Sequence, residues 1–316
     1  MLARFILGTL LLRNGVGLMS FGLAGFVGER AKKRIAAMVS SVPKACCVSA
    51  VFTALVQSSS LMTVLAVGLV DAGVISFGQA VGVIYGANIG TTLTLQIMTL
   101  PVTECAPLVL ASGLLVARFA RTVRGRNAGR TLVGAGLLFL GLRVLNSGAL
   151  LLQGSASFRY ALYASTRSPV VAMLFGVCST MLVHSSSATV GVALVLAKSG
   201  LIDLTGAVCL MLGDNIGTCV SAYAASRGRS IAARRTACAH LVYNVLGVAV
   251  ALLVLPLFVD LVRLSSADAA RQVANSHAIF NILSALLFIP ITSYFVRFIE
   301  SIVRGPNGSS VALRPK

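Results

Sequence analysis

Long apolar segments separated by short basic clusters make up most of the chain. A helix that crosses a bilayer needs about 20 consecutive apolar residues. Two apolar segments, 44–71 and 169–198, are interrupted near their middles by Gln or His and three consecutive Ser. The remaining segments are 5–27, 74–99, 105–119, 131–150, 201–225, 237–257 and 277–299. The pattern predicts an all-α polytopic membrane protein with about seven transmembrane helices.

The composition supports this prediction by excluding soluble and nucleic-acid-binding proteins. Charged residues make up 11% of the 316 residues, against about 25% in an average soluble protein. The mean hydropathy is +0.93, and the net charge is nevertheless +18. Such a basic chain usually suggests nucleic acid, but here Trp is absent and the basic residues lie between apolar runs. We therefore expect membrane lipids around the protein and no nucleic-acid partner.

The basic residues predict how the chain is oriented in the membrane. Basic loops stay in the cytoplasm, and 18 of the 26 Lys and Arg residues fall in four clusters. These are Arg30, Lys32, Lys33, Arg34 and Lys44; Arg118, Arg121, Arg124, Arg126 and Arg130; Arg227, Arg229, Arg234 and Arg235; and Arg297, Arg304, Arg314 and Lys316. If all four clusters are cytoplasmic, 44–71 must enter and leave on the cytoplasmic side, and 169–198 on the opposite side. Both segments are then re-entrant hairpins. The N-terminus lies outside and the C-terminus in the cytoplasm of a multi-pass protein of the inner membrane.

The two interrupted segments are copies of one another. Residues 53–92 align without a gap to 180–219, and 17 of the 40 positions are identical. The predicted helices that precede the two copies cross the membrane in opposite directions, so the repeat is inverted. Inverted repeats with discontinuous membrane segments are typical of secondary transporters. The expected units are a first repeat (1–130), an inverted second repeat (131–235), two additional transmembrane helices (236–299) and a cytoplasmic tail (300–316).

Three consecutive Ser in a membrane segment are costly unless their hydroxyls find partners. A single Ser triplet would be explained by close helix packing, but two copies at one register indicate a site. The N-terminus of a half-helix favours anions, and hydroxyl and amide groups add donors. The two hairpin tips therefore predict an oxyanion site near the midplane, formed by Gln57, Ser58, Ser59, Ser60, His184, Ser185, Ser186 and Ser187.

A second paired motif, Gly-x-Asn-Ile-Gly-Thr, begins at Gly86 and at Gly213. Amide, hydroxyl and freed backbone oxygens at an unwound point of a helix suit a monovalent cation. Asp214 is the only acidic residue deep in a predicted membrane motif, which makes it a functional candidate. The predicted cation ligands are Asn88, Thr91, Asp214, Asn215 and Thr218.

Other polar residues in the apolar segments have weaker signals. His240 with Asn244 and His277 with Asn281 share a helix face at i, i+4 spacing, which favours hydrogen bonds between helices. Arg13 and Arg143 are expected to snorkel or to form an internal pair. The seven Cys and three His show no metal-ligand spacing, so no catalytic residue and no metal beyond the coupling cation is expected.

The paired Gln/His-Ser-Ser-Ser and Gly-x-Asn-Ile-Gly-Thr motifs resemble those of the sodium–phosphate cotransporter family in its short bacterial form. The resemblance covers residues 7–298. It implies sodium-driven uptake of inorganic phosphate, with the Ser-rich tips at the phosphate and nearby Gln, Asn and Thr at the sodium ions. Sodium is then the coupling ion, and no other cofactor is implied. The chain departs from the family at His184, where Gln is usual, and at Asp214, where a small residue is common.

The residues leave several alternatives open. Within the transporter class these are another oxyanion or a small carboxylate, and proton coupling through His184 and Asp214. A membrane phosphatase acting on lipid pyrophosphate would need an acidic catalytic cluster, whereas only Asp214 is deep, so we expect no enzyme. A channel would need a charged ring or filter repeat, which the sequence lacks. A homodimer is compatible with the sequence.

Overall fold

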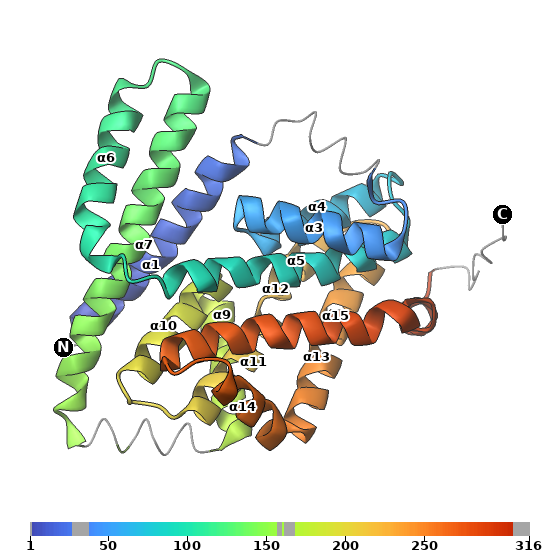
Figure 1. Ribbon diagram of the computed structural model, residues 1–316. Helices are drawn as coiled ribbons and strands as arrows, with labels where there is room; N and C mark the ends of the chain where they lie inside the picture. Colours follow the sequence, from blue (N-terminus) through green and yellow to red (C-terminus); the bar gives the residue numbers. More distant parts are fainter. Residues whose placement is uncertain (1, 27–37, 157–159, 161–167, 306–316) are drawn as a thin grey trace.

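The computed structural model describes residues 2–26, 38–156, 160 and 168–305, with the side chains of Leu2 and Leu152 left out. Throughout these residues the chain is helical, without strands (Figure 1). The helices are α1 (Leu2–Ala24), α3 (Val42–Val56), α4 (Ser59–Asp71), α5 (Phe77–Met98), η1 (Thr103–Cys105), α6 (Ala106–Phe119), α7 (Val123–Gln153), α9 (Pro169–Val183), α10 (Ser186–Lys198), α11 (Leu204–Gly217), α12 (Val220–Ser226), α13 (Ile231–Leu253), α14 (Leu255–Leu264) and α15 (Ala269–Ile302).

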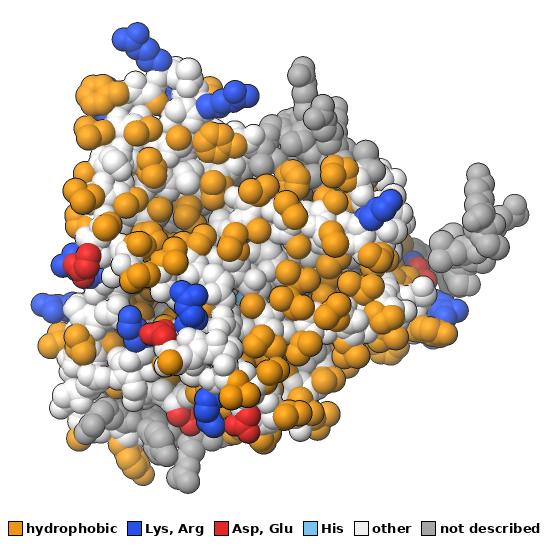
Figure 2. All heavy atoms as spheres, in the orientation of Figure 1, with side chains coloured by type: hydrophobic (Ala, Val, Ile, Leu, Met, Phe, Trp, Pro, Cys, Tyr) orange, Lys and Arg blue, Asp and Glu red, His pale blue; other side chains and the backbone are white. Residues whose placement is uncertain are grey.

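The expected all-α polytopic membrane fold is confirmed. Among the described residues, six segments are long and apolar enough to cross a membrane, namely α1, α5, α7, α11 with α12, α13 and α15. The seventh expected span, 105–119, forms the shorter helix α6, whose 14 residues are about 21 Å long. Figure 2 shows hydrophobic side chains spread over most of the visible face, as expected for a surface in contact with lipid. The basic residues predicted at 30–34 and the end of the tail at 306–316 lie outside the described residues.

Helices α1 and α7, the first helices of the two repeats, run antiparallel along a seam of glycines (Figure 1). A Cβ atom added to Gly15 would lie 2.8 Å from the carbonyl oxygen of Gly134, and one added to Gly134 would lie 2.7 Å from that of Gly15. Gly8 and Gly141 approach one another in the same reciprocal way. The two repeats therefore meet in a symmetric contact that requires residues without side chains.

Each hairpin packs against the helix that follows it, with the same geometry in both repeats. A Cβ on Gly86 of α5 would lie 2.0 Å from the carbonyl oxygen of Cys46 in α3. A Cβ on Gly213 of α11 would lie 1.9 Å from the carbonyl oxygen of Met173 in α9, at the matching register. The sequence repeat is thus a repeat of tertiary packing.

In the C-terminal part of the chain, α13 and α15 are long and apolar enough to cross a membrane. Between them lies a short helix that was not predicted, α14, which begins directly after α13 with Pro256 in its first turn. Pro is well tolerated there because the first N–H groups of a helix have no partner within it. Helix α15 packs along α5 and also contacts α10, α11 and α13. It thereby joins the two repeats.

Candidate functional site

The two hairpins turn through the same backbone conformation. Gln57 is the C-cap of helix α3 and His184 the C-cap of helix α9, and both residues are in the left-handed region, with φ of 59° and 53°. Ser58 and Ser185 follow in extended conformation, and each side chain accepts a hydrogen bond of 3.3 Å from the backbone N–H three residues later. The first serine of each triplet therefore caps a half-helix, and the next two lie in its first turn.

Both hairpin tips line one cavity of about 950 Å³. Its lining includes all eight predicted oxyanion residues, together with eight residues of α1 between Arg13 and Ala24, and Leu61, Thr91 and Leu137. The tips are not equivalent within it, because Gln57 is buried and His184 is exposed. The backbone oxygen of Gln57 accepts a hydrogen bond of 2.8 Å from the Ser20 hydroxyl of α1. The first tip is thus bonded to α1, whereas the residue at the second tip, His184, is exposed.

A much smaller cavity lies beside the tips, with a volume of about 10 Å³. This is room for about one water-sized sphere. One serine from each triplet lines it, together with all five predicted cation ligands and a histidine. The complete lining is Ser59, Asn88, Thr91, Ser186, Asp214, Asn215, Thr218 and His277. Side chains from both repeats and from α15 therefore meet around a space the size of a single ion.

Asp214 is the one acidic residue in this small cavity and is 1% exposed. Its carboxylate accepts a hydrogen bond of 2.7 Å from Thr180. A buried carboxylate with one hydroxyl partner is poorly compensated. A bound cation, or a proton on the carboxylate, would remove that penalty.

The amide side chains of the two copies have different partners. Asn88 donates a hydrogen bond of 2.9 Å to Asn244, whose own amide group donates to the carbonyl of His240. Asn215 donates instead to the carbonyl of Met211, one turn earlier in its own helix. The expected interhelical role of Asn244 is therefore confirmed.

The expected unwinding at the Gly-x-Asn-Ile-Gly-Thr motif occurs in one copy only. Helix α11 ends at Gly217, and Cys219 forms a tighter turn by donating to the carbonyl of Ile216 at 3.1 Å. The prediction is wrong for the first copy, because α5 continues through Gly90 and Thr91 without a break. A Cβ on Gly90 would lie 2.5 Å from the carbonyl oxygen of Ala50, so this glycine serves close helix packing.

Three residues of the site were missed by the sequence analysis. Arg13 and Asn14 of α1 line the large cavity, and His277 of α15 lines the small one. The interruption of an apolar segment by Arg13 and Asn14 was the available signal. Arg143, by contrast, forms an exposed ion pair with Glu104 at 3.4 Å rather than an internal pair.

Comparisons with known proteins identify the family. The model of the family described as Na+/Pi-cotransporter matches the chain twice, over 10–147 and 148–289. YqeW of Bacillus subtilis (strain 168) is 33% identical over 289 residues, which cover 92% of this chain and 94% of the relative.

Two further relatives are longer proteins. The "Putative inorganic phosphate export protein YjbB" of Escherichia coli (strain K12) is 26% identical over 96% of this chain. Its namesake in Salmonella typhimurium is 25% identical over the same share. The chain spans 56% of the length of each. No solved structure matches the chain. With both halves matched by one family model, the chain belongs to the Na+/Pi-cotransporter family.

Proposed function

We propose that the protein is a secondary transporter that couples the movement of inorganic phosphate across the inner membrane to sodium. The observation that carries the proposal is the meeting of both Ser-rich tips in one large cavity, beside a small cavity that contains the only buried carboxylate of the site. Under this proposal the protein is a transporter and not an enzyme, and none of its residues has a catalytic role.

Phosphate binds in the large cavity between the two tips. The serine hydroxyls and the N–H groups at the starts of α4 and α10 supply donors for its oxygens. Arg13 is the basic side chain of the cavity lining and supplies a positive charge. Arg13 is exposed, so its guanidinium is accessible to an anion that enters the cavity.

Sodium binds in the small cavity. Hydroxyl, amide and carboxylate oxygens are the ligands that hard cations prefer, and this cavity collects them from both repeats. Ser59 and Ser186 line both cavities. These two serines connect the sodium site to the phosphate site, so each ligand affects the affinity for the other.

The energetics favour co-transport. Carrying a phosphate dianion inward against 100 mV costs about 4.6 kcal/mol, because each charge costs about 2.3 kcal/mol. Two sodium ions cancel this electrical cost, and a sodium gradient directed inward then drives uptake. With the predicted sidedness, the large cavity follows the cytoplasmic half of α1, from Arg13 to Ala24. A cytoplasmic opening is an inward-facing state, which releases phosphate during uptake.

Export is the second candidate for direction, because two relatives carry that word in their names. A symporter is reversible, so the gradients decide the direction. Proteoliposomes that contain the purified chain test both directions with radiolabelled phosphate. Uptake that follows an imposed sodium gradient and reverses with it is the expected result. Phosphate movement that depends on a proton gradient, or on neither cation, would reject sodium symport.

A further inference from the structure

A second polar cavity lies at the far ends of α5, α10 and α15, away from the hairpin tips. Its volume is about 300 Å³, and its polar lining consists of Thr99, Thr103, Asn146, Lys198, Asp268 and Arg271. We call it the basic pocket. Figure 2 shows basic side chains and an acidic one gathered around a hollow in this region. With the predicted sidedness, the basic pocket opens on the extracytoplasmic face.

The two basic side chains of this pocket are not neutralised by ion pairs. Neither Lys198 nor Arg271 has an acidic side chain within 4.0 Å among the residues that the structure describes. Arg263, on the same side of the protein, is paired with Asp260 at 3.1 Å. Basic residues are scarce in extracytoplasmic loops, so two unpaired ones in a single hollow are unusual.

The acidic residue of the pocket, Asp268, forms a backbone hydrogen bond and no ion pair with the two basic side chains. Asp268 caps helix α15, and its carboxylate accepts a hydrogen bond of 2.7 Å from the backbone N–H of Arg271. The basic pocket therefore has a formal charge of +1 and free donors on both basic side chains. Threonine hydroxyls at 99 and 103 and the amide of Asn146 add neutral donors.

Three helices connect the basic pocket to the proposed transport site. On α10, Lys198 is 12 residues, or about 18 Å, from Ser186. On α5, Thr99 is about 12 Å from Thr91, and on α15, Arg271 is about 9 Å from His277.

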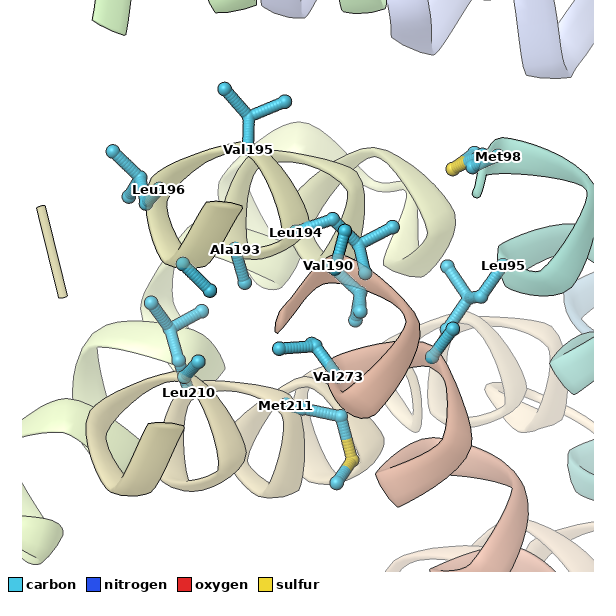
Figure 3. Close-up of a cluster of buried hydrophobic side chains, with 14 of the residues drawn as sticks. Leu95, Met98, Val190, Ala193, Leu194, Val195, Leu196, Leu210, Met211 and Val273 are labelled. Carbon is cyan, nitrogen blue, oxygen red and sulfur yellow. The ribbon is translucent and has the colours of Figure 1, made fainter. Parts of the chain in front are cut away.

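An apolar layer fills the space between the basic pocket and the small cavity. It consists of Leu95, Met98, Val190, Leu194 and Val273, each at most 5% exposed. Figure 3 shows these side chains directed toward one another between the helices. Three of them, Leu95, Val190 and Val273, lie on α5, α10 and α15 between a residue of the small cavity and one of the basic pocket. The other two, Met98 and Leu194, also line the basic pocket. An anion in the basic pocket would thus be held outside the closed side of the transport site.

We infer that the basic pocket is a docking site for a small oxyanion, which it binds with Lys198 and Arg271 before or after passage through the transport site. The anion class follows from the charges of the pocket itself. The choice of inorganic phosphate as the probe rests on the proposed function.

Lys198 itself reports whether the pocket is occupied. It is the one lysine outside the cytoplasmic clusters, and Lys44 is an exposed lysine that serves as internal reference. The full chain in lipid nanodiscs is treated with an amine-acylating reagent, in phosphate or in chloride at equal ionic strength. Mass spectrometry then gives the modification rate at each lysine. Phosphate is expected to slow acylation of Lys198 several-fold relative to Lys44.

Three variants test whether phosphate protects Lys198 from acylation by binding in the basic pocket. Arg271→Gln should abolish it, whereas Arg263→Gln, which changes a paired arginine on the same side, should retain it. The double variant Ser59→Ala, Ser186→Ala should also retain it, because those serines lie in the other site. Equal acylation in phosphate and chloride, or protection lost with the two serines, would overturn the inference. Protection without phosphate transport would reject the proposed function alone, and transport without protection would reject the docking site alone.

Discussion

The Thr180 hydroxyl donates a hydrogen bond of 2.7 Å to the Asp214 carboxylate, and the first repeat has no equivalent of this pair. The matching residues there are Thr53 and Ala87, and the buried hydroxyl of Thr53 has no hydrogen-bond partner. The two repeats therefore share the conformation of their hairpin tips but differ at this pair, where only the second repeat has an acidic residue. The Asp214 carboxylate lies on the wall of the small cavity, and under the proposed function it attracts the sodium ion.

Replacing Asp214 by Asn should weaken the response to sodium. The amide still accepts the hydrogen bond from Thr180 but lacks the charge that attracts a cation. We expect the sodium concentration for half-maximal phosphate uptake to rise at least tenfold, which corresponds to about 1.4 kcal/mol. Uptake into proteoliposomes measured over a sodium series checks this. Thr180→Ser keeps the hydrogen-bond donor and is the matched control. An unchanged dependence of uptake on sodium in Asp214→Asn would show that the carboxylate does not bind the coupling ion.

Ser59 and Ser186 should matter for transport more than for stability. Each lines both cavities, whereas Ser58 and Ser185 cap their helices. Alanine at 59 or 186 should strongly reduce phosphate uptake at a similar protein level in the membrane. Ser112→Ala, on α6 and far from the site, is the control. Normal uptake in both single variants would refute the proposed phosphate site.

The capping serines should matter for stability as well. Loss of an N-cap typically costs about 1 kcal/mol of stability, so Ser185→Ala should lower the thermal denaturation temperature of the purified protein. Ser185→Asn retains a capping side chain and should restore that temperature. If Ser185→Ala were as stable as the parent protein, the hydrogen bond to the backbone of Ala188 would contribute nothing to the hairpin.

The left-handed tips predict which substitutions they tolerate. His184 and Gln57 have positive φ, where a β-branched residue is strained. His184→Val should therefore destabilise the tip and reduce uptake. His184→Gln reproduces the residue that the first tip already uses and should support transport. Equal activity of the two variants would show that the tip conformation does not limit transport.

Glycine substitutions test the close packing between hairpin and helix. Gly86→Ala would bring a Cβ to 2.0 Å from the Cys46 carbonyl oxygen, and overpacking of this kind costs about 1–3 kcal/mol. Gly78→Ala on the same helix meets nothing within 4 Å and should stabilise α5 by about 0.5–1 kcal/mol. Thermal denaturation in detergent separates the two. A Gly86→Ala protein as stable as Gly78→Ala would contradict the helix contact.

The orientation in the membrane is tested by cysteine labelling. In a background without the seven native cysteines, Cys at Glu104 should react with an impermeant reagent from outside. Cys at Arg126 should react from the cytoplasmic side only. The reverse pattern would invert the assignment of both hairpins and of the basic pocket.

The sequence predicted the hairpins because two independent signals met there. Charge sidedness required segments that return to their own side, and the Ser triplets at 58–60 and 185–187 interrupted the same segments. The grouping of the candidate residues around two adjacent cavities was also foreseeable from the repeat. Periodicity did not reveal the left-handed turns at Gln57 and His184, because neither residue type requires that conformation.

Other features depended on tertiary contacts that a single sequence does not encode locally. Nothing in the neighbourhood of His277 distinguishes it from His240, yet only His277 reaches the small cavity. Gly90 appeared to allow unwinding but lies against the backbone of α3. Helix α14 was missed because its ten residues follow α13 without a polar loop.

The glycine seam between α1 and α7 has a mechanical consequence. A Cβ atom added to Gly15 or to Gly134 would lie at a similar distance from the carbonyl oxygen of the other glycine, so the seam is almost unchanged when the two helices are interchanged. A transporter built from inverted repeats reaches its opposite state when each half adopts the shape of the other. Most other contacts between the halves must then be remade, but this contact is the same before and after the exchange. The seam can therefore serve as the axis of a rotation in which the two halves exchange their conformations.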